Sequence, residues 1–448
     1  MELTDIPDER SYAQQQQELL AQYGCPLILL SLHTFGPIDE HYAVFKRAFQ
    51  EGLERVEAAL TASGGKVLYR GVQATPPGLS YGVWVIDGSG KDLKRLCVEL
   101  EDTDALSQLF DLDVVEPDGR KWDRSQLGCP PRKCILCGCK RHSCAARNAH
   151  PTKVLQQTAQ QILWDFFAQQ DSKRLAALAA KALLYEVCTT PKPGLVDRNN
   201  NGSHKDMDLF TFLDSTAALL PYFEQAAALG QKTAGLPPEE TFRLLRALGI
   251  RGEQAMFRAT SGVNTHKGAI FSLGTVCAGA GRLWTPAGLP TESSSLLRQC
   301  SSLCAQAVRE DLAAITPESA ATVGQQLYLD YGLDGIRGEL SRGLPAVAQI
   351  GLPALKKALS VGSTLEQAGV SVLLHLMAHV SDTNLIARGG LEGQHWAADQ
   401  AQDLLDRGTT DSEAVVELDR RLIRRNLSPG GCADLLAITY FLYFLTLE

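Results

Sequence analysis

The sequence predicts an α+β domain followed by an all-α domain. Short apolar runs bounded by turn formers occur up to about residue 115, which is the pattern of strands. Beyond Thr152 they give way to long helical patterns separated by glycine- and proline-marked loops. At 448 residues the chain is also too long for one compact core. We therefore expect one domain over residues 1–165 and another over 173–448.

The elements follow from these patterns in chain order. The first domain should contain strands over the runs 26–32, 66–72, 81–86, 95–101 and 109–115, with a helix over 42–62. The second should contain helices over 173–188, 239–259, 267–282, 295–314, 364–380, 397–407, 411–426 and 432–447. The apolar run 435–447 is too short to span a bilayer and predicts a buried C-terminal helix.

Composition excludes several classes of protein. Charged residues make up 21% of the chain, which is typical of a folded soluble protein. The formal charge of −8 argues against nucleic-acid binding, which needs a basic face. The N-terminus lacks the apolar stretch of a signal peptide, and no segment predicts a membrane span. Twelve cysteines without an export signal predict reduced thiols and a cytoplasmic location.

Five loops of the helical domain concentrate acids, bases and glycines, namely 189–208, 261–268, 331–339, 381–390 and 426–436. Their chemistry suits a polyphosphate. Cations that can offset its charge are Lys192, Lys205, Lys267, Arg337 and Arg388. Carboxylates that can hold Mg²⁺, which prefers one or two acids plus phosphate oxygens, are Asp206, Asp208, Glu253, Asp382 and Asp434.

The loop at 261–268, SGVNTHKG, precedes an apolar helix that we expect to start near Lys267. The free N–H groups of a helix start attract anions, and Lys267 adds a full charge there. Asn264, Thr265 and His266 add directional donors. The alternative is a capped helix with a buried polar anchor.

In the first domain, Asp111 and Asp113 stand two apart on a predicted strand and so face the same way. Paired carboxylates of this kind can grip Mg²⁺ for phosphoryl or nucleotidyl transfer, and Glu99 on the preceding run could join them. The alternative is a solvent-facing strand that carries alternating acids.

Five of the twelve cysteines lie between Cys129 and Cys144. Cys134 and Cys137, with Cys144 and His150, form a Cys₃His set that suits structural Zn²⁺, and buried free thiols are the alternative. Cys129, Cys139 and His142 compete as ligands. The basic residues around the set predict a phosphate-rich ligand or an acidic protein partner: Arg132, Lys133, Lys140, Arg141 and Arg147.

The loops of the helical domain resemble the triphosphoribosyl-dephospho-CoA synthase family. The resemblance rests on PKPGLVDRNNNGSHKDMD, MFRATSGVNTHKGAIFSLG, YGLDGIRGE, DTNLIARGG and RNLSPGGCADLLAITYFL, in this order over about 173–448. It implies that the 2′-hydroxyl of 3′-dephospho-CoA attacks the anomeric carbon of ATP and expels adenine, with the triphosphate retained. Such a reaction needs a base, a Mg²⁺ and cation cradle, and a proton donor for adenine.

The resemblance also implies site residues. We expect catalytic roles for His204, His266 and Lys267, with either histidine as acid or base. Substrate-binding residues are expected to be Lys192, Asp197, Lys205, Asn264, Arg337, Glu339, Asn384, Arg388 and Ser428. Metal ligands for Mg²⁺ are expected to be Asp206, Glu253, Asp382 and Asp434.

Residues 25–165 resemble the holo-citrate lyase synthase family, also called apo-citrate lyase phosphoribosyl-dephospho-CoA transferase. The resemblance rests on LFDLDVV, PPRKCILC and the spacing of Cys144, Arg147 and His150. It implies transfer of phosphoribosyl-dephospho-CoA from the synthase product to a serine of the apo acyl carrier subunit of citrate lyase, with release of pyrophosphate. Asp111 and Asp113 would be catalytic there, and Arg132 and Lys133 would bind substrate.

The first domain departs from that family's pattern before the Asp-x-Asp strand. Ser107-Gln108 stands where Gly-Arg is usual, and Arg70 or Arg95 could replace the lost arginine. After the strand, Asp123-Arg124 stands for Ser-Arg. A bifunctional enzyme is therefore expected, and two alternatives remain. One is a synthase with an inactive N-terminal docking module, and the other is the equivalent enzyme of malonate decarboxylase.

Overall fold

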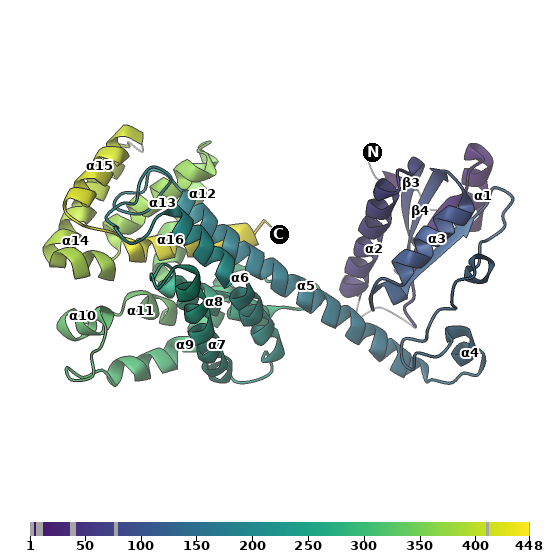
Figure 1. The fold of residues 1–448 in the computed structure, drawn as a ribbon, viewed down its shortest axis with the longest axis horizontal. Coiled ribbons are helices and arrows are strands. Elements are labelled where there is room, and N and C mark those ends of the chain that lie inside the picture. Colours follow the sequence, from purple (N-terminus) through teal and green to yellow (C-terminus); the bar gives the residue numbers. More distant parts are fainter. Residues whose placement is uncertain (1–3, 6–11, 36–41, 76–78, 409–411, 448) are drawn as a thin grey trace. The chain divides into compact units, whose positions relative to one another are not determined.

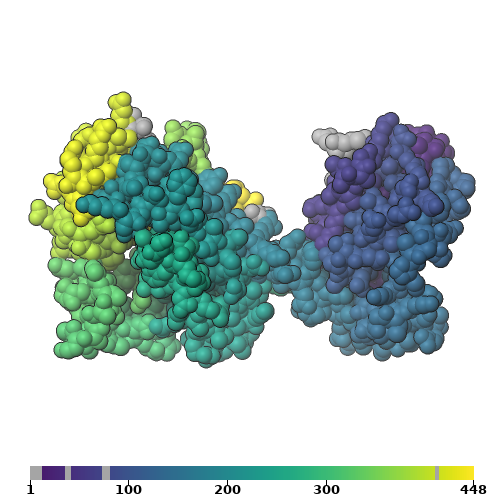
Figure 2. All heavy atoms as spheres, viewed as in Figure 1, coloured from purple at the N-terminus to yellow at the C-terminus, as the bar shows by residue number. Residues whose placement is uncertain are grey.

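The computed structural model of the chain describes residues 4–5, 12–35, 42–75, 79–408 and 412–447. Its contacts divide the chain into two compact units, Met1–Phe167 and Ala168–Glu448, called the N-terminal and the C-terminal unit below. The N-terminal unit is a sheet with helices, and the C-terminal unit is helical (Figure 1). The predicted fold class is therefore confirmed. Figure 2 shows that segments from the whole second part of the chain gather in the C-terminal unit.

The sheet of the N-terminal unit has the strand order β1-β3-β4-β2-β5. Neighbouring strands are antiparallel except β1, which pairs with β3 in parallel. The strands are β1 (Thr4–Asp5), β2 (Leu27–Leu32), β3 (Lys66–Thr75), β4 (Leu79–Asp87) and β5 (Phe110–Val115). β2 lies between two neighbours, and its first four residues are buried because both faces of the sheet are covered there.

Helices cover the two faces of this sheet. α1 (Tyr12–Tyr23) packs Leu20 against Leu27 and Leu29 on one face. α2 (Tyr42–Ala62) packs on the other, where Gly52 lies against the side chains of Leu30 and Phe110. Because side chains alternate along a strand, Asp111 and Asp113 point away from the face that Phe110 and Leu112 occupy.

The predicted strand at 95–101 is wrong. These residues form the second half of α3 (Gly90–Glu101), whose start is capped by the Ser89 side chain. Leu93, Cys97 and Val98 recur at helical spacing and are buried, which a short run of residues does not distinguish from a strand. Glu99 is consequently an exposed helix residue, whereas Glu101 is buried.

The rest of the N-terminal unit follows β5. The short η3 (Arg124–Leu127) and α4 (Arg141–Ala146) flank the cysteine cluster. α5 (Thr152–Cys188) begins in the N-terminal unit and ends in the C-terminal unit without a break. Leu163 and Phe167 on this helix are buried in the first unit, and Leu175 is buried in the core of the second.

The C-terminal unit contains α6 (Leu209–Lys232), α7 (Pro238–Ala259), α8 (Lys267–Leu283), α9 (Ser293–Ala313), α10 (Val323–Tyr331), α11 (Gly335–Ser341), the π-helical η4 (Val347–Gly351), α12 (Leu352–Ser360), α13 (Leu365–His379), α14 (Thr383–Asp406), α15 (Ser412–Arg424) and α16 (Gly430–Leu445). α8 packs on α6 with the backbones in contact. A Cβ on Gly230 would lie 2.0 Å from the Ala278 carbonyl oxygen, and one on Gly281 2.1 Å from that of Ala227. Glycine at these positions lets α6 hold α8 closely.

Most predicted helices are confirmed, and α8 starts at Lys267 as expected. The apolar run 435–447, predicted to be a buried helix, forms most of the buried α16, as expected. Three of the predicted loops are wrong in part, and one of them is 426–436, where α16 already begins at Gly430. α11 begins inside 331–339, and α14 occupies most of 381–390 because the Asp382 side chain caps its first turn.

Within the described residues, no single helix is long and apolar enough to cross a membrane. α13 and α14 together pass that test by length and composition, with a bend of 54° between them.

Candidate active sites

The C-terminal unit has a cavity of about 330 Å³, called the central cavity below, where all five of the predicted loops meet. The loops 189–208, 261–268, 381–390 and 426–436 contribute several residues each to its wall, and 331–339 contributes Ile336 of α11. Nine predicted site residues line it: Lys192, His204, Asn264, His266, Lys267, Asn384, Arg388, Ser428 and Asp434. The first turn of α8 opens into the same wall through Lys267 and Gly268.

The start of α8 is held by close contacts. The Lys267 backbone N–H donates to the Asn264 side-chain oxygen at 3.2 Å, and the Lys267 ammonium lies 3.2 Å from a Glu253 carboxylate oxygen. Gly268 lies against Asp434 of α16, and a Cβ on Gly268 would be 2.0 Å from Asp434 Oδ2. The free N–H groups of this helix start make the wall favourable to anions.

His266, the residue before α8, is 3% exposed. Its Nδ1 lies 2.7 Å from the Ser215 hydroxyl of α6, and its Nε2 has no hydrogen-bond partner among the described residues. Burial, and then the Lys192 charge, lower the pKa of His266 to about 3. The ring is therefore a neutral imidazole at neutral pH.

His204 makes different contacts. Arg388 donates to His204 Nδ1 at 3.3 Å, because a guanidinium can only donate. The ring proton therefore sits on Nε2, which donates to the Ser428 hydroxyl at 2.9 Å. Burial and the Arg388 charge lower the pKa of His204.

Lys192 is fully buried in the wall, where it forms an ion pair with the buried Glu186 of α5. Asp197 does not line the cavity. Its carboxylate accepts hydrogen bonds from the backbone N–H groups of Lys192, Asn199 and Asn200 at 2.7–3.0 Å, so it holds the loop that carries Lys192. The buried Lys192–Glu186 ion pair is costly to break, since removal of one partner leaves the other as a buried unpaired charge.

The four carboxylates predicted to bind Mg²⁺ lie apart. Asp434 lines the central cavity, has no hydrogen-bond or ion-pair partner among the described residues, and has its pKa raised to about 8 by burial and by Glu186. The Asp382 carboxylate accepts from the backbone N–H groups of Asn384, Leu385 and Cys432, and so ties the starts of α14 and α16 together.

The remaining acids and cations of that prediction lie away from the central cavity. Glu253 and Arg337 line a smaller hollow of about 230 Å³. Lys205 and Asp206 are exposed, and Asp206 lies 4.0 Å from His204. Asp208 caps the start of α6.

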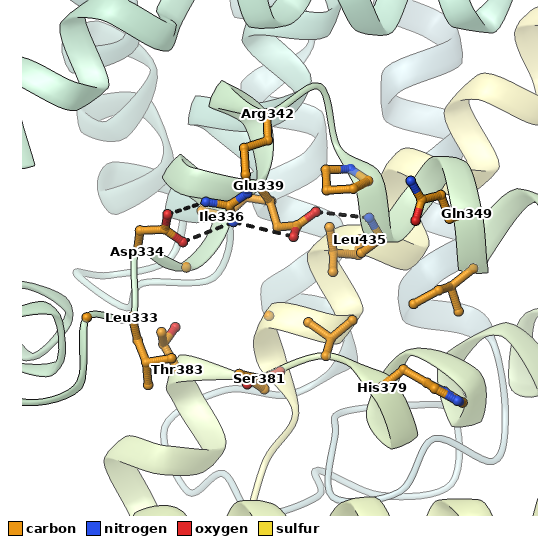
Figure 3. A pocket seen from close by; sticks show the side chains of 18 residues that line it. Leu333, Asp334, Ile336, Glu339, Arg342, Gln349, His379, Ser381, Thr383 and Leu435 are labelled. Atoms are coloured by element: carbon orange, nitrogen blue, oxygen red, sulfur yellow. Dashed lines mark hydrogen bonds and ion pairs between the residues drawn. The ribbon is translucent and has the colours of Figure 1, made fainter.

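A second cavity of about 370 Å³ lies beside the central one (Figure 3). Ile336, Thr383 and Gly431 line both cavities. In the second cavity, Arg342 is neutralised by two hydrogen bonds to Asp334 and by Glu339 at 3.6 Å. Glu339 in turn accepts from the Ala346 N–H at 3.1 Å, and η4 contributes Gln349 to the wall. Among the described residues that line it, this cavity offers polar and apolar surface without an unpaired lysine or arginine.

The N-terminal unit has a cavity of about 670 Å³ that contains both aspartates of β5. Asp111 pairs with Arg132 at 2.7 Å, and Asp113 with Lys121 at 2.7 Å. Other residues of its lining are His33, Lys94, Glu101, Arg124, Arg141 and His142. Carboxylates and arginines thus face one space, as transfer between phosphates requires.

Several of these residues carry no sequence signal of their own. Glu101 takes the place expected of Glu99, and it pairs with Arg124 at 2.8 Å. Burial and the charge of Arg141 lower the pKa of His33 to about 4. Arg70 and Arg95 do not line this cavity; they pair with Glu57 and Asp92 respectively. Ser107 is buried and accepts a hydrogen bond from Arg55 at 2.8 Å.

The predicted cysteine set comes together next to this cavity. One ligand atom from each of Cys134, Cys137, Cys144 and His150 lies within 4.8 Å of the others. The Cys134 N–H donates to the Cys139 carbonyl, and the Gly138 N–H to the Cys134 carbonyl, which closes a tight turn between the first two cysteines. Tetrahedral Zn²⁺ with bonds of about 2.3 Å places its sulfur ligands roughly 3.8 Å apart, so this group fits the ion.

Comparison with known proteins assigns the two parts of the chain to two families. Residues 172–448 match the family of ATP:dephospho-CoA triphosphoribosyl transferases, CitG, and residues 2–166 match that of apo-citrate lyase phosphoribosyl-dephospho-CoA transferases, CitX. Protein CitXG of Haemophilus influenzae is 36% identical over 451 residues, which cover 98% of this chain and 94% of the relative. The chain belongs to the CitXG family.

Other relatives match either the CitG part of the chain or most of the chain. The 2-(5''-triphosphoribosyl)-3'-dephosphocoenzyme-A synthase of Pectobacterium atrosepticum is 47% identical over 264 residues, 59% of this chain and 86% of the relative. Protein CitXG of Leuconostoc mesenteroides is 34% identical over 385 residues, 83% of this chain and 81% of the relative. The central cavity lies in the CitG part, and the cavity lined by Asp111 and Asp113 lies in the CitX part.

Proposed function

We propose that this CitX–CitG fusion makes and attaches the prosthetic group of citrate lyase in two consecutive transfers. In the first, ATP and 3′-dephospho-CoA give 2′-(5″-triphosphoribosyl)-3′-dephospho-CoA and adenine. In the second, phosphoribosyl-dephospho-CoA passes to a serine of the apo acyl carrier subunit, and pyrophosphate leaves. The central cavity carries the proposal, because the helix N–H groups of α8 and Arg388, which has no carboxylate partner among the described residues, face one space with the ion-paired Lys192 and Lys267, and this lining suits a triphosphate.

In the first transfer, the 2′-oxygen of dephospho-CoA bonds to the anomeric carbon of ATP and the bond from that carbon to adenine breaks. The hydroxyl proton must leave and adenine must gain one. The cations of the central cavity hold the triphosphate in place. The second cavity, whose only arginine is neutralised among the described residues, suits an uncharged part of a substrate.

Of the four acids predicted to hold Mg²⁺ here, Asp434 fits best. It lines the cavity and has no hydrogen-bond or ion-pair partner in the part of the chain that the structure describes, and Mg²⁺ in nucleotide sites takes one or two carboxylates plus phosphate oxygens. Bound Mg²⁺ would neutralise charge on the triphosphate and would favour the ionised form of Asp434. The Asp382 carboxylate is occupied by three backbone N–H groups and fits less well.

In the second transfer, the serine oxygen of the carrier attacks the α-phosphorus and the bond to the leaving pyrophosphate breaks. Asp111 and Asp113 would hold Mg²⁺, which offsets phosphate charge, and Arg132, Arg124 and Arg141 supply cations around them. These three arginines support transferase activity although Ser107-Gln108 replaces the Gly-Arg pair that is usual in the family. We further propose that Zn²⁺ binds the Cys₃His set and fixes the segment that carries Arg132 and Arg141.

None of the twelve cysteines, all of which lie in the described part of the chain, forms a disulfide, which supports a cytoplasmic location. The test incubates purified protein with ATP, 3′-dephospho-CoA, Mg²⁺ and the apo carrier subunit of citrate lyase. We expect adenine release and a carrier mass increase by one phosphoribosyl-dephospho-CoA. Adenine release without carrier modification would favour an inactive N-terminal docking module. Modification of a malonate decarboxylase carrier alone would favour the equivalent enzyme of that system.

A further inference from the structure

The hydroxyl groups of Thr265 and Ser215 determine which ring nitrogen of His266 carries the proton. The Thr265 hydroxyl donates to the Ser215 oxygen at 2.7 Å, and Ser215 lies 2.7 Å from His266 Nδ1. A serine hydroxyl has a single proton. Among the described residues the only acceptor for that proton is His266 Nδ1, so Ser215 donates to Nδ1 while it accepts from Thr265, and the imidazole proton sits on Nε2.

That Nε2–H group is buried and has no hydrogen-bond partner among the described residues. The side chain lines the central cavity together with Lys192 and Lys267. A buried donor without a partner is costly and calls for an explanation. The Nε2–H of His204, in contrast, is already used on Ser428.

We propose that Ser215 and Thr265 hold His266 in the Nε2–H tautomer so that it donates a hydrogen bond to a phosphate oxygen of the bound triphosphate. His266 then binds and orients the triphosphate without moving a proton, and Ser215 is a positioning residue. The proposal rests on the proposed function for the identity of the ligand. The tautomer itself follows from the side-chain contacts alone.

The first measurement is ¹⁵N NMR of histidine-labelled full-length protein, with His266 assigned through His266→Gln. We expect a neutral Nε2–H ring at pH 6 in the wild type and a mixture of tautomers in Ser215→Ala. An imidazolium at pH 6, or the Nδ1–H form, would overturn the proposal whether or not the protein releases adenine.

The second measurement is the affinity for inorganic tripolyphosphate by calorimetry. A glutamine amide nitrogen can reach the place of Nε2, whereas an asparagine amide reaches only that of Nδ1. His266→Gln should bind within about threefold of wild type, and His266→Asn and His266→Ala about tenfold or more weakly, with thermal unfolding as the check on folding. Equal loss in all three variants would refute the donor role. Tight tripolyphosphate binding without adenine release would sink the proposed function and leave the donor role standing.

Discussion

Gly268→Ala is the sharpest test of the central cavity, because the new methyl group would lie 2.0 Å from Asp434 Oδ2. Ordinary contacts of a Cβ begin near 3.4 Å, so the start of α8 or Asp434 must move by more than 1 Å. Overpacking of this kind costs about 1–3 kcal/mol, against a helix-propensity gain of at most about 1 kcal/mol. A displacement of about 1 Å at reacting groups can cost on the order of 100-fold in rate.

Adenine release from ATP and 3′-dephospho-CoA is the assay, with thermal unfolding in parallel. We expect a loss of about 100-fold or more in rate and a small loss of stability. Gly249→Ala is the matched control, because its nearest heavy atom would be the Tyr222 hydroxyl at 3.9 Å. In an Asp434→Ala background, Gly268→Ala should no longer destabilise the protein. Adenine release at the wild-type rate by Gly268→Ala would refute this account of the cavity.

Three further predictions follow from the two units. Cys137→Ser should lose bound zinc, measured by elemental analysis, and destabilise the N-terminal unit while adenine release persists, whereas Cys139→Ser should retain the metal. Asp111→Asn should reduce carrier modification at least 100-fold without changing adenine release, and the exposed Asp118→Asn should change neither. Because the pKa of His266 is about 3 when folded and about 6.5 when unfolded, stability should fall as the pH drops below 6.5, by about 1.4 kcal/mol per pH unit. His266→Gln should show a smaller change in its thermal midpoint between pH 7 and pH 5; an equal change would contradict the buried neutral ring.

The start of α8 could be predicted because several local signals agree there. The Asn264 side chain accepts from the first N–H of the helix, Gly262 permits the turn, and the apolar helix follows directly. The pairing of Asp111 with Asp113 could be predicted because the side-chain period of a strand is two. Both follow from the covalent spacing of nearby residues.

Longer-range packing was not predictable from the same patterns. α6 contains Pro221 in its middle, which predicts a helix break, yet the helix continues to Lys232 and packs closely on α8 at Gly230. Ser215 lies inside α6 and Glu186 in the last turn of α5, and neither belongs to a motif. Their part in the central cavity emerges only from contacts across the fold. The four acids predicted to bind Mg²⁺ together show the opposite error. They lie in loops of similar chemistry, but the fold does not bring their side chains to one point.

The join between the two family matches, residues 166–172, lies inside α5. Proteases usually cut multidomain chains at exposed loops, but here each backbone amide at the join belongs to a regular helix. A nick there first requires the helix to open. If two genes were fused at these residues, the two parts of the protein now share α5. A truncation at this point therefore removes a helical turn that the other part needs.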